Sequence, residues 1–297
     1  MKVIDSHFHI YKNEQTGILA QGGVPMAGFT GALGEAIPIV DRSPLDRIVA
    51  VAVIPIASMR KAAMAKWPAD LKASEKTENK LLLEEKLQSR LSGFNEWLLS
   101  VGREHEYITP VIAADPTVDE TFMTEHILSA MKSDAITALK IHPAANSTCP
   151  SDKGYYPVYE LAQENDLTVI SHGGLSGDDL EGKFCTPEHF QAVCRDFPRL
   201  KIVVAHLCYP HSNRLMDLFE SCPNLFTDLS FVLGNAPYDD GTLVKMINRF
   251  GPDRVLYGSD YPWSDPEKDI LRFMRLKLTD SEQERIVYRN AVELFGV

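Results

Sequence analysis

The sequence predicts an α/β fold, a single-domain (β/α)₈ TIM barrel, and three observations support this prediction. The chain has 297 residues, close to the ~250 residues of a barrel that folds as one domain. Short runs rich in Val and Ile alternate with stretches of helical composition, which is typical of βα units repeated around a parallel sheet. Eight such runs occur, the number that closes a barrel of this type.

Each expected strand is a short apolar run that ends at a polar residue or a turn-forming segment. In chain order the eight runs cover residues 3–9, 48–54, 107–113, 138–142, 167–172, 201–206, 225–230 and 255–260. A flavodoxin-like sheet also alternates strands with helices, but it usually needs fewer strands. No Gly-rich phosphate-binding sequence follows the first run here, so the barrel is preferred.

Helices are expected between most of these strands. They cover residues 80–103, 119–131, 156–165, 187–196, 212–220, 241–250 and 281–294. Thr186 and Asp265 each stand before a proline, which places a capping side chain ahead of a residue that suits the first helical turn. Residues 57–79, rich in Ala, Lys and Met, are expected to extend the helical layer.

Residues 12–43 interrupt the repeat between the first two strands. Six glycines break any periodicity there: Gly17, Gly22, Gly23, Gly28, Gly31 and Gly34. We interpret this segment as a loop inserted within the single domain, residues 1–297. Because loops after barrel strands lie on the catalytic face, the segment is expected beside the active site, as a flap over substrate or as a surface excursion.

The composition narrows the range of partners. The chain is 44% apolar and 24% charged with a formal charge of −11, which fits a globular protein but offers no basic tract to neutralise nucleic acid. An anionic small-molecule substrate would therefore need a local group of cationic side chains or a metal. We expect no nucleic-acid partner, and a homodimer is the default oligomeric state.

The cysteines and the N-terminus indicate a cytoplasmic enzyme. Five cysteines without a C-x-x-C pair predict reduced thiols rather than a disulfide framework or a structural zinc site. Residues 1–7 carry an acid and a histidine where a signal peptide needs an apolar run. No segment is apolar for long enough to span a bilayer, so no membrane partner is expected.

Polar residues gather at the C-terminal ends of the predicted strands, which is the catalytic face of a barrel. They are His7, His9, Lys140, His142, His172, His206 and Asp260. Side chains alternate along a strand, so His7 and His9 point to the same side and can bind one ion together. Three imidazoles and one carboxylate form an open site that suits zinc and other divalent metals.

A single histidine at a strand end is more often a hydrogen-bonded structural residue than a ligand. Here His7, His9, His172 and His206, four of the nine histidines, fall at matching ends together with Asp260, which packing alone does not require. The histidines at positions 105, 126, 189 and 211 fall in predicted helices or loops. We interpret those four as surface or capping residues.

Four motifs in order resemble the amidohydrolase superfamily. They are Asp5-Ser6-His7-Phe8-His9, Ser171-His172-Gly173, Ala205-His206-Leu207 and Tyr257-Gly258-Ser259-Asp260-Tyr261-Pro262-Trp263. More narrowly they resemble its amidohydrolase-2 branch, which includes aminocarboxymuconate-semialdehyde decarboxylase and lactone-hydrolysing relatives. The resemblance spans residues 5–262 and implies that His7, His9, His172 and Asp260 bind one divalent metal, usually zinc, with manganese as the alternative.

The resemblance also assigns roles to the residues around the metal. Asp260 would take a proton from the attacking water, and His206 would hold or polarise the reacting oxygen. In binuclear members of the superfamily a lysine on the fourth strand is carboxylated and bridges two metals, a position that Lys140 matches. The branch resembled here is generally mononuclear, so Lys140 and His142 are assigned to binding an anionic substrate, although Lys140 could equally pair with a buried acid.

These residues predict a metal-dependent hydrolase that attacks an ester, lactone or amide carbonyl of a small, carboxylated molecule with metal-activated water. The alternative is a metal-dependent, non-oxidative decarboxylase of an aromatic or unsaturated acid. A barrel that binds metal without catalysis is disfavoured because no ligand is replaced. Asp5, deeper on the first strand, is expected to orient a metal ligand through a hydrogen bond. Weaker candidates near strand ends are Arg60, Cys208, Arg214, Asp228, Tyr261 and Trp263.

Overall fold

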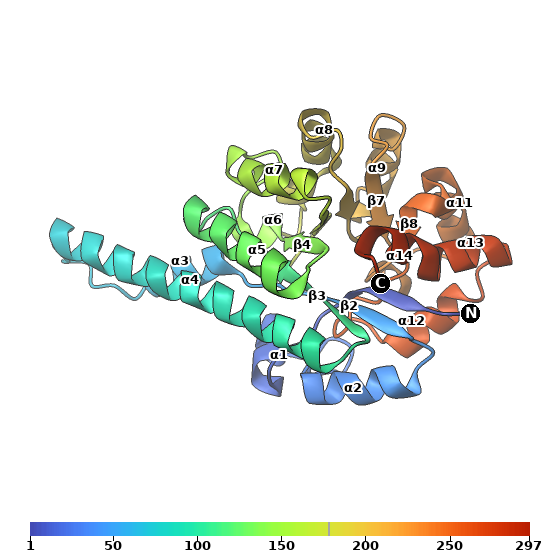
Figure 1. Ribbon diagram of the computed structural model, residues 1–297, viewed down its shortest axis with the longest axis horizontal. Helices are drawn as coiled ribbons and strands as arrows, with labels where there is room; N and C mark the ends of the chain where they lie inside the picture. Colours follow the sequence, from blue (N-terminus) through green and yellow to red (C-terminus); the bar gives the residue numbers. More distant parts are fainter. Residues whose placement is uncertain (178) are drawn as a thin grey trace.

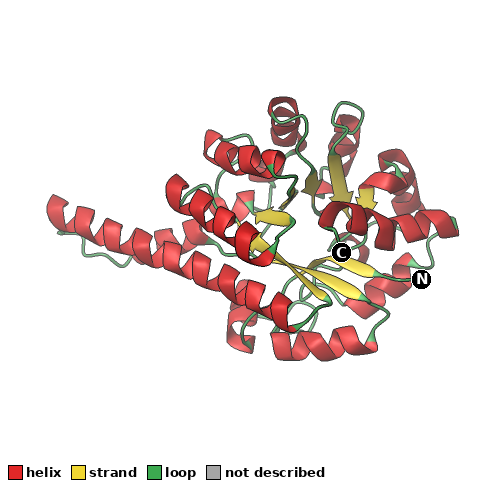
Figure 2. Cartoon of the chain, in the orientation of Figure 1, coloured by secondary structure: helices red, strands yellow, loops and turns green. Residues whose placement is uncertain are grey.

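Eight parallel strands form one sheet in the order of the chain (Figures 1 and 2). The structure, a computed structural model, describes residues 1–177 and 179–297. The strands are β1 (Ile4–Phe8), β2 (Arg47–Val51), β3 (Ile108–Ala113), β4 (Ala138–Ile141), β5 (Thr168–Ser171), β6 (Ile202–Val204), β7 (Leu225–Asp228) and β8 (Val255–Leu256). Each of the eight predicted runs overlaps a strand, which confirms the barrel.

The barrel closes between its first and last strands through scattered backbone hydrogen bonds rather than a regular ladder. Ser6 N donates to Tyr257 O at 2.9 Å, and Asp260 N donates to His7 O at 2.9 Å. His9 N also donates to Tyr261 O at 2.8 Å. These bonds hold the segment after β8, which carries Asp260, against the end of β1.

Helices surround the sheet (Figure 2). They are α1 (Glu14–Ala20), α2 (Leu33–Arg42), α3 (Ile56–Met64), α4 (Ala73–Glu104), α5 (Glu120–Asp134), α6 (Pro143–Asn146), α7 (Tyr156–Glu164), α8 (Pro187–Asp196), α9 (Ser212–Leu218), α10 (Val232–Asn235), α11 (Asp240–Phe250), α12 (Pro266–Phe273), α13 (Asp280–Glu284) and α14 (Asn290–Phe295). The last predicted helix is interrupted by a π-helical turn, Arg285–Arg289.

Residues 12–43, expected as a loop, contain the helices α1 and α2. The helical signal of α2 is weak in the sequence because α2 has no capping side chain and holds Pro38 inside. The glycine-rich stretch lies between the two helices, where Gly31 has φ +78° and faces Pro262. Tyr261 Oη donates to Glu35 at 2.7 Å. These contacts place the inserted segment beside the end of β8, the region that carries Asp260.

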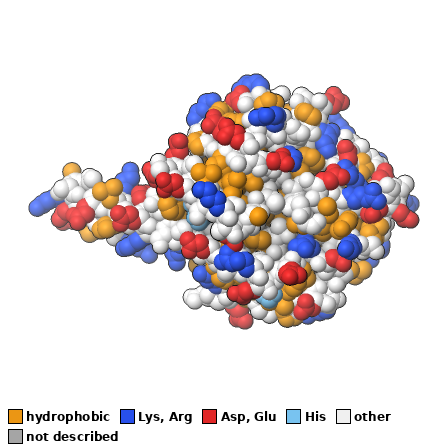
Figure 3. All heavy atoms as spheres, viewed as in Figure 1, with side chains coloured by type: hydrophobic (Ala, Val, Ile, Leu, Met, Phe, Trp, Pro, Cys, Tyr) orange, Lys and Arg blue, Asp and Glu red, His pale blue; other side chains and the backbone are white. Residues whose placement is uncertain are grey.

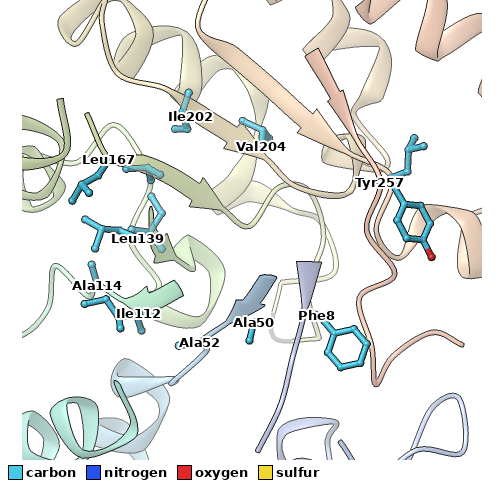
Figure 4. Packing of buried hydrophobic residues seen from close by; sticks show 14 of the residues in the cluster. Phe8, Ala50, Ala52, Ile112, Ala114, Leu139, Leu167, Ile202, Val204 and Tyr257 are labelled. Atoms are coloured by element: carbon cyan, nitrogen blue, oxygen red, sulfur yellow. The ribbon is translucent and has the colours of Figure 1, made fainter. Parts of the chain in front are cut away.

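Strand alternation separates two apolar layers. One side of the strands packs outward on the helices through residues such as Leu139, Ile202 and Tyr257 (Figure 4). The other side forms a smaller cluster inside the barrel that includes Ala138 and Ile170, and α14 packs against this cluster. Lys140 and His172 lie two residues beyond Ala138 and Ile170, so the same alternation points both toward the barrel axis.

A buried acid on the outer side of the barrel predicts a pH-dependent stability. Burial, together with the charges of Asp5 and Asp265, raises the pKa of Asp269 to about 8. Between the ordinary pKa of 3.8 and about 8, the folded chain holds a proton that the unfolded chain releases. The contribution of Asp269 to the free energy of unfolding is therefore complete below the lower value and lost as the pH rises through the higher one.

Replacing Asp269 with Asn, which mimics the protonated carboxyl, should remove this loss. In urea unfolding, Asp269→Asn should match the parent near pH 4 and become progressively more stable than the parent toward pH 8. A stability difference that does not change across this range would contradict the protonated state of Asp269.

Two further sequence expectations concern membranes and thiols. Among the described residues, no helix is both long and apolar enough to cross a membrane. All five cysteines are free thiols: Cys149, Cys185, Cys194, Cys208 and Cys222.

Candidate metal centre

The predicted site residues come together at the C-terminal ends of the strands. His7 and Lys140 lie within β1 and β4, and the others follow their strands by one to four residues: His9, His142, His172, His206 and Asp260. All are buried except His142, which is half-buried. His206 and Asp260 have φ values of +61° and +68°, a rare backbone conformation that is concentrated at functional sites.

His7 presents a free ring nitrogen to the centre of the barrel. Its Nδ1 lies 2.9 Å from Asp228 Oδ2, and because an ionised carboxylate only accepts hydrogen bonds, Nδ1 carries the proton. The lone pair is therefore on Nε2, which lies 3.3 Å from Lys140 Nζ and 3.7 Å from Asp260 Oδ1.

His9 is arranged in the same way by a backbone carbonyl. Its Nδ1 lies 2.8 Å from Val51 O, which fixes the proton on Nδ1. The unprotonated Nε2 then faces Asp260 Oδ1 at 3.2 Å. Two hydrogen-bond acceptors thus stand at contact distance with no proton between them.

His172 and His206 form a second pair of this kind. His172 Nε2 lies 2.9 Å from Leu175 O, and His206 Nδ1 lies 3.1 Å from Ser230 O. Both carbonyls require a proton on the nitrogen that they contact. The remaining nitrogens, His172 Nδ1 and His206 Nε2, face each other at 3.2 Å.

Protonation of the rings does not relieve these contacts. Burial, and next the charge of Lys140, lowers the pKa of His7 to about 3. Burial also lowers the pKa of His9, despite Asp260, and that of His172, where His142 adds to the effect. The rings of His7, His9 and His172 are therefore neutral, and a cation would satisfy their inward lone pairs. Neutral imidazoles with a carboxylate are the ligands that zinc and similar divalent metals prefer.

Asp260 supplies the negative charge of this group. Burial opposes its ionisation, but the surrounding His206, His9 and His7 outweigh burial and lower its pKa. The ligand atoms of His7, His206 and Asp260 all lie within 4.8 Å of one another. This group includes His206, which was predicted to stand beside the metal, but not His9 or His172, two of the predicted ligands.

Lys140 is fully buried and its amine contacts His7. Burial lowers the pKa of Lys140 to about 8, although Asp228 and Asp260 oppose this effect. A neutral amine is therefore accessible near physiological pH, beside the histidine nitrogens rather than in an ion pair with one acid.

His142 lies at the edge of this group. Its Nδ1 accepts a hydrogen bond from Ala145 N at 3.1 Å and so caps α6. Its ring stacks on that of His172, with 4.1 Å between the centroids. Because Nδ1 is an acceptor, Nε2 carries the proton and remains available to a substrate.

Asp228 has a larger part in this centre than its sequence position indicated. Its Oδ2 contacts His7, while Oδ1 accepts from His206 N at 2.8 Å and from Ser230 N at 3.1 Å. Burial opposes ionisation, but His7 and His206 lower its pKa well below its usual range. In the sequence, Asp228 was marked only by its position at the end of a predicted strand. Exposed loop residues occupy such positions as well, so the position alone did not single out Asp228.

Asp228→Asn is expected to weaken metal binding about 10- to 100-fold, as for other groups that orient a metal ligand. The amide would offer either a donor or a weaker acceptor to His7 Nδ1, so His7 would lose the tautomer that frees Nε2. Isothermal titration with Zn²⁺ measures this change. Unchanged affinity, with circular dichroism like that of the parent, would contradict the orienting role.

The other weak candidates have partners that explain them. Arg60 binds Glu84, Arg214 binds Glu188, Tyr261 binds Glu35, Cys208 donates to Cys185 O, and Asp5 accepts from the backbone of His7 and Ser259. Trp263 is different, because its ring meets that of His9 edge-on at 5.1 Å. The remaining histidines lie outside this group, and three of them bond to Asn95, Ser151 and Glu181 respectively.

Comparison with known proteins identifies the family. A sequence profile of the amidohydrolase family matches residues 4–297. The chain belongs to the amidohydrolase family. This amidohydrolase is an enzyme of the superfamily that its four motifs resemble, and the geometry described above is its candidate metal centre.

Individual relatives are more distant. A dihydroorotase of Helicobacter hepaticus is 30% identical over 107 residues, 33% of this chain and 30% of that protein. The chain thus matches about a third of the length of this curated relative. An uncharacterised TIM-barrel protein from Bordetella bronchiseptica superposes with a TM-score of 0.75 at 18% identity, over 99% of this chain and 98% of the other.

A decarboxylase shares the same architecture. The dihydroxybenzoic acid decarboxylase from Polaromonas sp. JS666, solved with bound manganese and 2-nitroresorcinol, superposes with a TM-score of 0.72 at 14% identity. The superposition covers 99% of this chain and 97% of that one. At this identity the likeness shows a common fold.

Proposed function

We propose that this amidohydrolase is a metal-dependent hydrolase that attacks an ester, lactone or amide carbonyl of a small, carboxylated substrate. The observation that carries the proposal is that ring nitrogens of His7, His9 and His206 lie close to Asp260, while that of His172 faces His206. The unprotonated Nε2 of His9 lies 3.2 Å from the Asp260 carboxylate, a contact between two acceptors that a bound cation would relieve.

His7, His9, His172 and Asp260 would hold one divalent ion, zinc in the first instance and manganese as the alternative. A divalent ion lowers the pKa of a water molecule that it binds and polarises a carbonyl group. The donor set fits this ion, because each imidazole is held by a hydrogen bond on its other nitrogen, as metal-binding histidines usually are.

Asp260 and His206 would carry the proton transfers. As water attacks the carbonyl carbon, the Asp260 carboxylate accepts the proton of that water and returns it to the leaving oxygen or nitrogen. His206 Nε2 faces the same space and would hold the reacting oxygen. Lys140 and the Nε2–H of His142 would bind the carboxylate of the substrate.

The neighbouring segment would shield this chemistry from solvent. Residues 12–43 are fastened to the end of β8 through Tyr261 and Glu35, and we propose that their glycine-rich part covers bound substrate. The free thiols are consistent with a cytoplasmic location, which we propose as well.

A decarboxylase is the second candidate. It is favoured by the full-length structural likeness to a dihydroxybenzoic acid decarboxylase, whereas the partial likeness to a dihydroorotase favours hydrolysis of a cyclic amide. If the enzyme is a decarboxylase, His206 would support protonation of the carbon of the substrate ring that then loses carbon dioxide.

A substrate panel separates the two functions. The metal-loaded enzyme is incubated with lactones, cyclic amides and hydroxybenzoic acids, and both ring opening and released carbon dioxide are measured. Turnover of a lactone or amide without carbon dioxide is the expected result. Carbon dioxide release from a hydroxybenzoic acid, with no hydrolysis of the other compounds, would overturn the hydrolase in favour of the decarboxylase.

A further inference from the structure

Tyr11 continues the chain of β1 past the metal centre. It follows His9 by two residues, and its backbone pairs with the inserted segment. Tyr11 N donates to Gly31 O at 2.9 Å, and Leu33 N donates to Tyr11 O at 2.9 Å. Side chains two residues apart on an extended chain project to the same side, so the alternation predicts Tyr11 on the side of His7 and His9.

The ring of Tyr11 is enclosed by the inserted segment and by α4. A Cβ atom at Gly17 or Gly31 would lie 3.1 or 3.0 Å from Tyr11 Cδ2, so these two glycines make room for one edge of the ring. The ring of Phe94 in α4 lies at 6.3 Å between centroids. Gly31 also faces Pro262, so Tyr11 lies beside the segment after β8 that carries the carboxylate of the metal centre.

The hydroxyl of Tyr11 is a buried polar group without a partner. Charged side chains of both signs lie on the surface shown in Figure 3, where water can satisfy them, but Tyr11 is only 2% exposed. Its hydroxyl has no hydrogen-bond partner within residues 1–177 and 179–297. Buried tyrosine hydroxyls usually bond to another polar group, because an unpaired one costs free energy. This hydroxyl therefore indicates a partner from outside the chain, either water or a ligand.

The negative charge of the metal centre acts on this hydroxyl. Burial, and next the charge of Asp260, raises the pKa of Tyr11 above its ordinary range, so the hydroxyl keeps its proton and can donate a hydrogen bond. The centre is enclosed to a similar degree, with His206 and Asp260 exposed by 6% and 7%. This agrees with a segment that covers bound substrate. Tyr11 thus offers a donor on the Asp260 side of a closed centre.

Tyr11 lies across the barrel from the residues assigned to the substrate carboxylate. Lys140 is on β4 and His142 follows it, whereas Tyr11 follows β1 and lies beside the segment after β8. In the sheet, β2 and β3 separate β1 from β4, and β5, β6 and β7 separate β4 from β8. A substrate at the metal centre therefore lies between these two positions and can contact both.

We propose that Tyr11 is a substrate-binding residue whose hydroxyl donates a hydrogen bond to a neutral oxygen of the substrate, away from the carboxylate held by Lys140 and His142. A second carboxylate is disfavoured there, because a buried anion needs a positive partner and this hydroxyl brings none. The substrate class is thus a small carboxylic acid with a ring oxygen, hydroxyl or carbonyl distant from its carboxylate. The inference rests on the proposed function, since it places the substrate at the metal centre.

Tyr11→Phe removes only the hydroxyl and separates a binding role from a structural one. Because the hydroxyl has no partner in the described chain, the metal-loaded variant should be at least as stable as the parent in urea unfolding. Tyr159→Phe is the matched control, because it removes a buried hydroxyl that donates to Pro150 O at 2.9 Å. This control should lose stability and bind ligands like the parent.

Isothermal titration of the metal-loaded protein with benzoate and with the three monohydroxybenzoates tests the hydrogen bond. These probes share a carboxylate and differ in one neutral oxygen. The parent should bind at least one hydroxybenzoate about 3- to 10-fold more tightly than benzoate, as one neutral hydrogen bond allows. Tyr11→Phe should lose this preference and keep the affinity for benzoate, whereas Tyr159→Phe should keep both.

A parent without the preference would overturn the proposal. So would a preference that Tyr11→Phe retains, and loss of stability in that variant would then assign the hydroxyl to a bound water. If Tyr11→Phe loses the preference but the parent hydrolyses no compound of the substrate panel, Tyr11 remains a binding residue and the proposed hydrolase is removed. Hydrolysis by a parent that shows no preference would leave the proposed function standing without Tyr11.

Discussion

Asp260→Ala is expected to abolish both metal binding and turnover. Asp260 supplies the carboxylate that faces His9 at 3.2 Å and His7 at 3.7 Å, so its removal takes away the only negative charge among the proposed ligands. Metal affinity should fall by more than the ~10–100-fold that follows loss of a supporting hydrogen bond. His7→Ala should behave in the same way, because it removes one of the converging nitrogens.

Metal content after dialysis against Zn²⁺, measured by elemental analysis, checks this expectation. Asp260→Asn keeps the side-chain shape and removes the charge, so it should also lose the metal. Asp217→Ala, whose carboxylate pairs with Arg249 on the surface, is the control and should retain the metal. Metal binding by Asp260→Ala with the affinity of the parent would show that the ion, if bound, lies elsewhere.

His206→Ala is expected to keep most of the metal and lose turnover by about 10²–10⁴-fold, the usual contribution of a group that assists proton transfer or polarises the reacting atom. Its Nε2 faces His172 and the space beside Asp260. Metal content and kcat, measured on the substrate that the panel identifies, are the two readings. His211→Ala alters a half-buried histidine outside the metal centre and should change neither.

Two outcomes would revise the role of His206. Unchanged kcat in His206→Ala would remove it from catalysis. Loss of the metal would make His206 a ligand. This would agree with its position, because a ring nitrogen of His206 lies within 4.8 Å of the ligand atoms of His7 and Asp260.

The barrel could be predicted from the sequence because its strands are buried on both sides and read as apolar runs. The helices of the inserted segment could not, since Pro38 lies inside α2 and no capping side chain marks the start of α2. The helix α4 begins at Ala73, seven residues before the predicted start. This end of α4 buries nothing against the barrel, so its residues are polar. The apolar pattern that predicts a helix is therefore missing there.

The residues of the metal centre were also predictable, since strand ends meet at one face of a barrel. The positions of the protons on the histidine rings could not be predicted, because they depend on hydrogen-bond acceptors from distant parts of the chain. His7 is oriented by Asp228, His9 by Val51 O and His206 by Ser230 O. These partners become visible only when neighbouring strands are placed side by side.

Metal binding by the parent protein tests the central claim most directly. The chelator-treated, full-length chain is titrated with Zn²⁺ and with Mn²⁺, and the bound metal is counted per chain after dialysis. About one ion per chain is expected from the donor geometry and the proposed ligands His7, His9, His172 and Asp260. About two ions would make Lys140 a carboxylated ligand that bridges both and would favour hydrolysis. No bound metal with either ion would contradict the claim that these nitrogens form a metal centre.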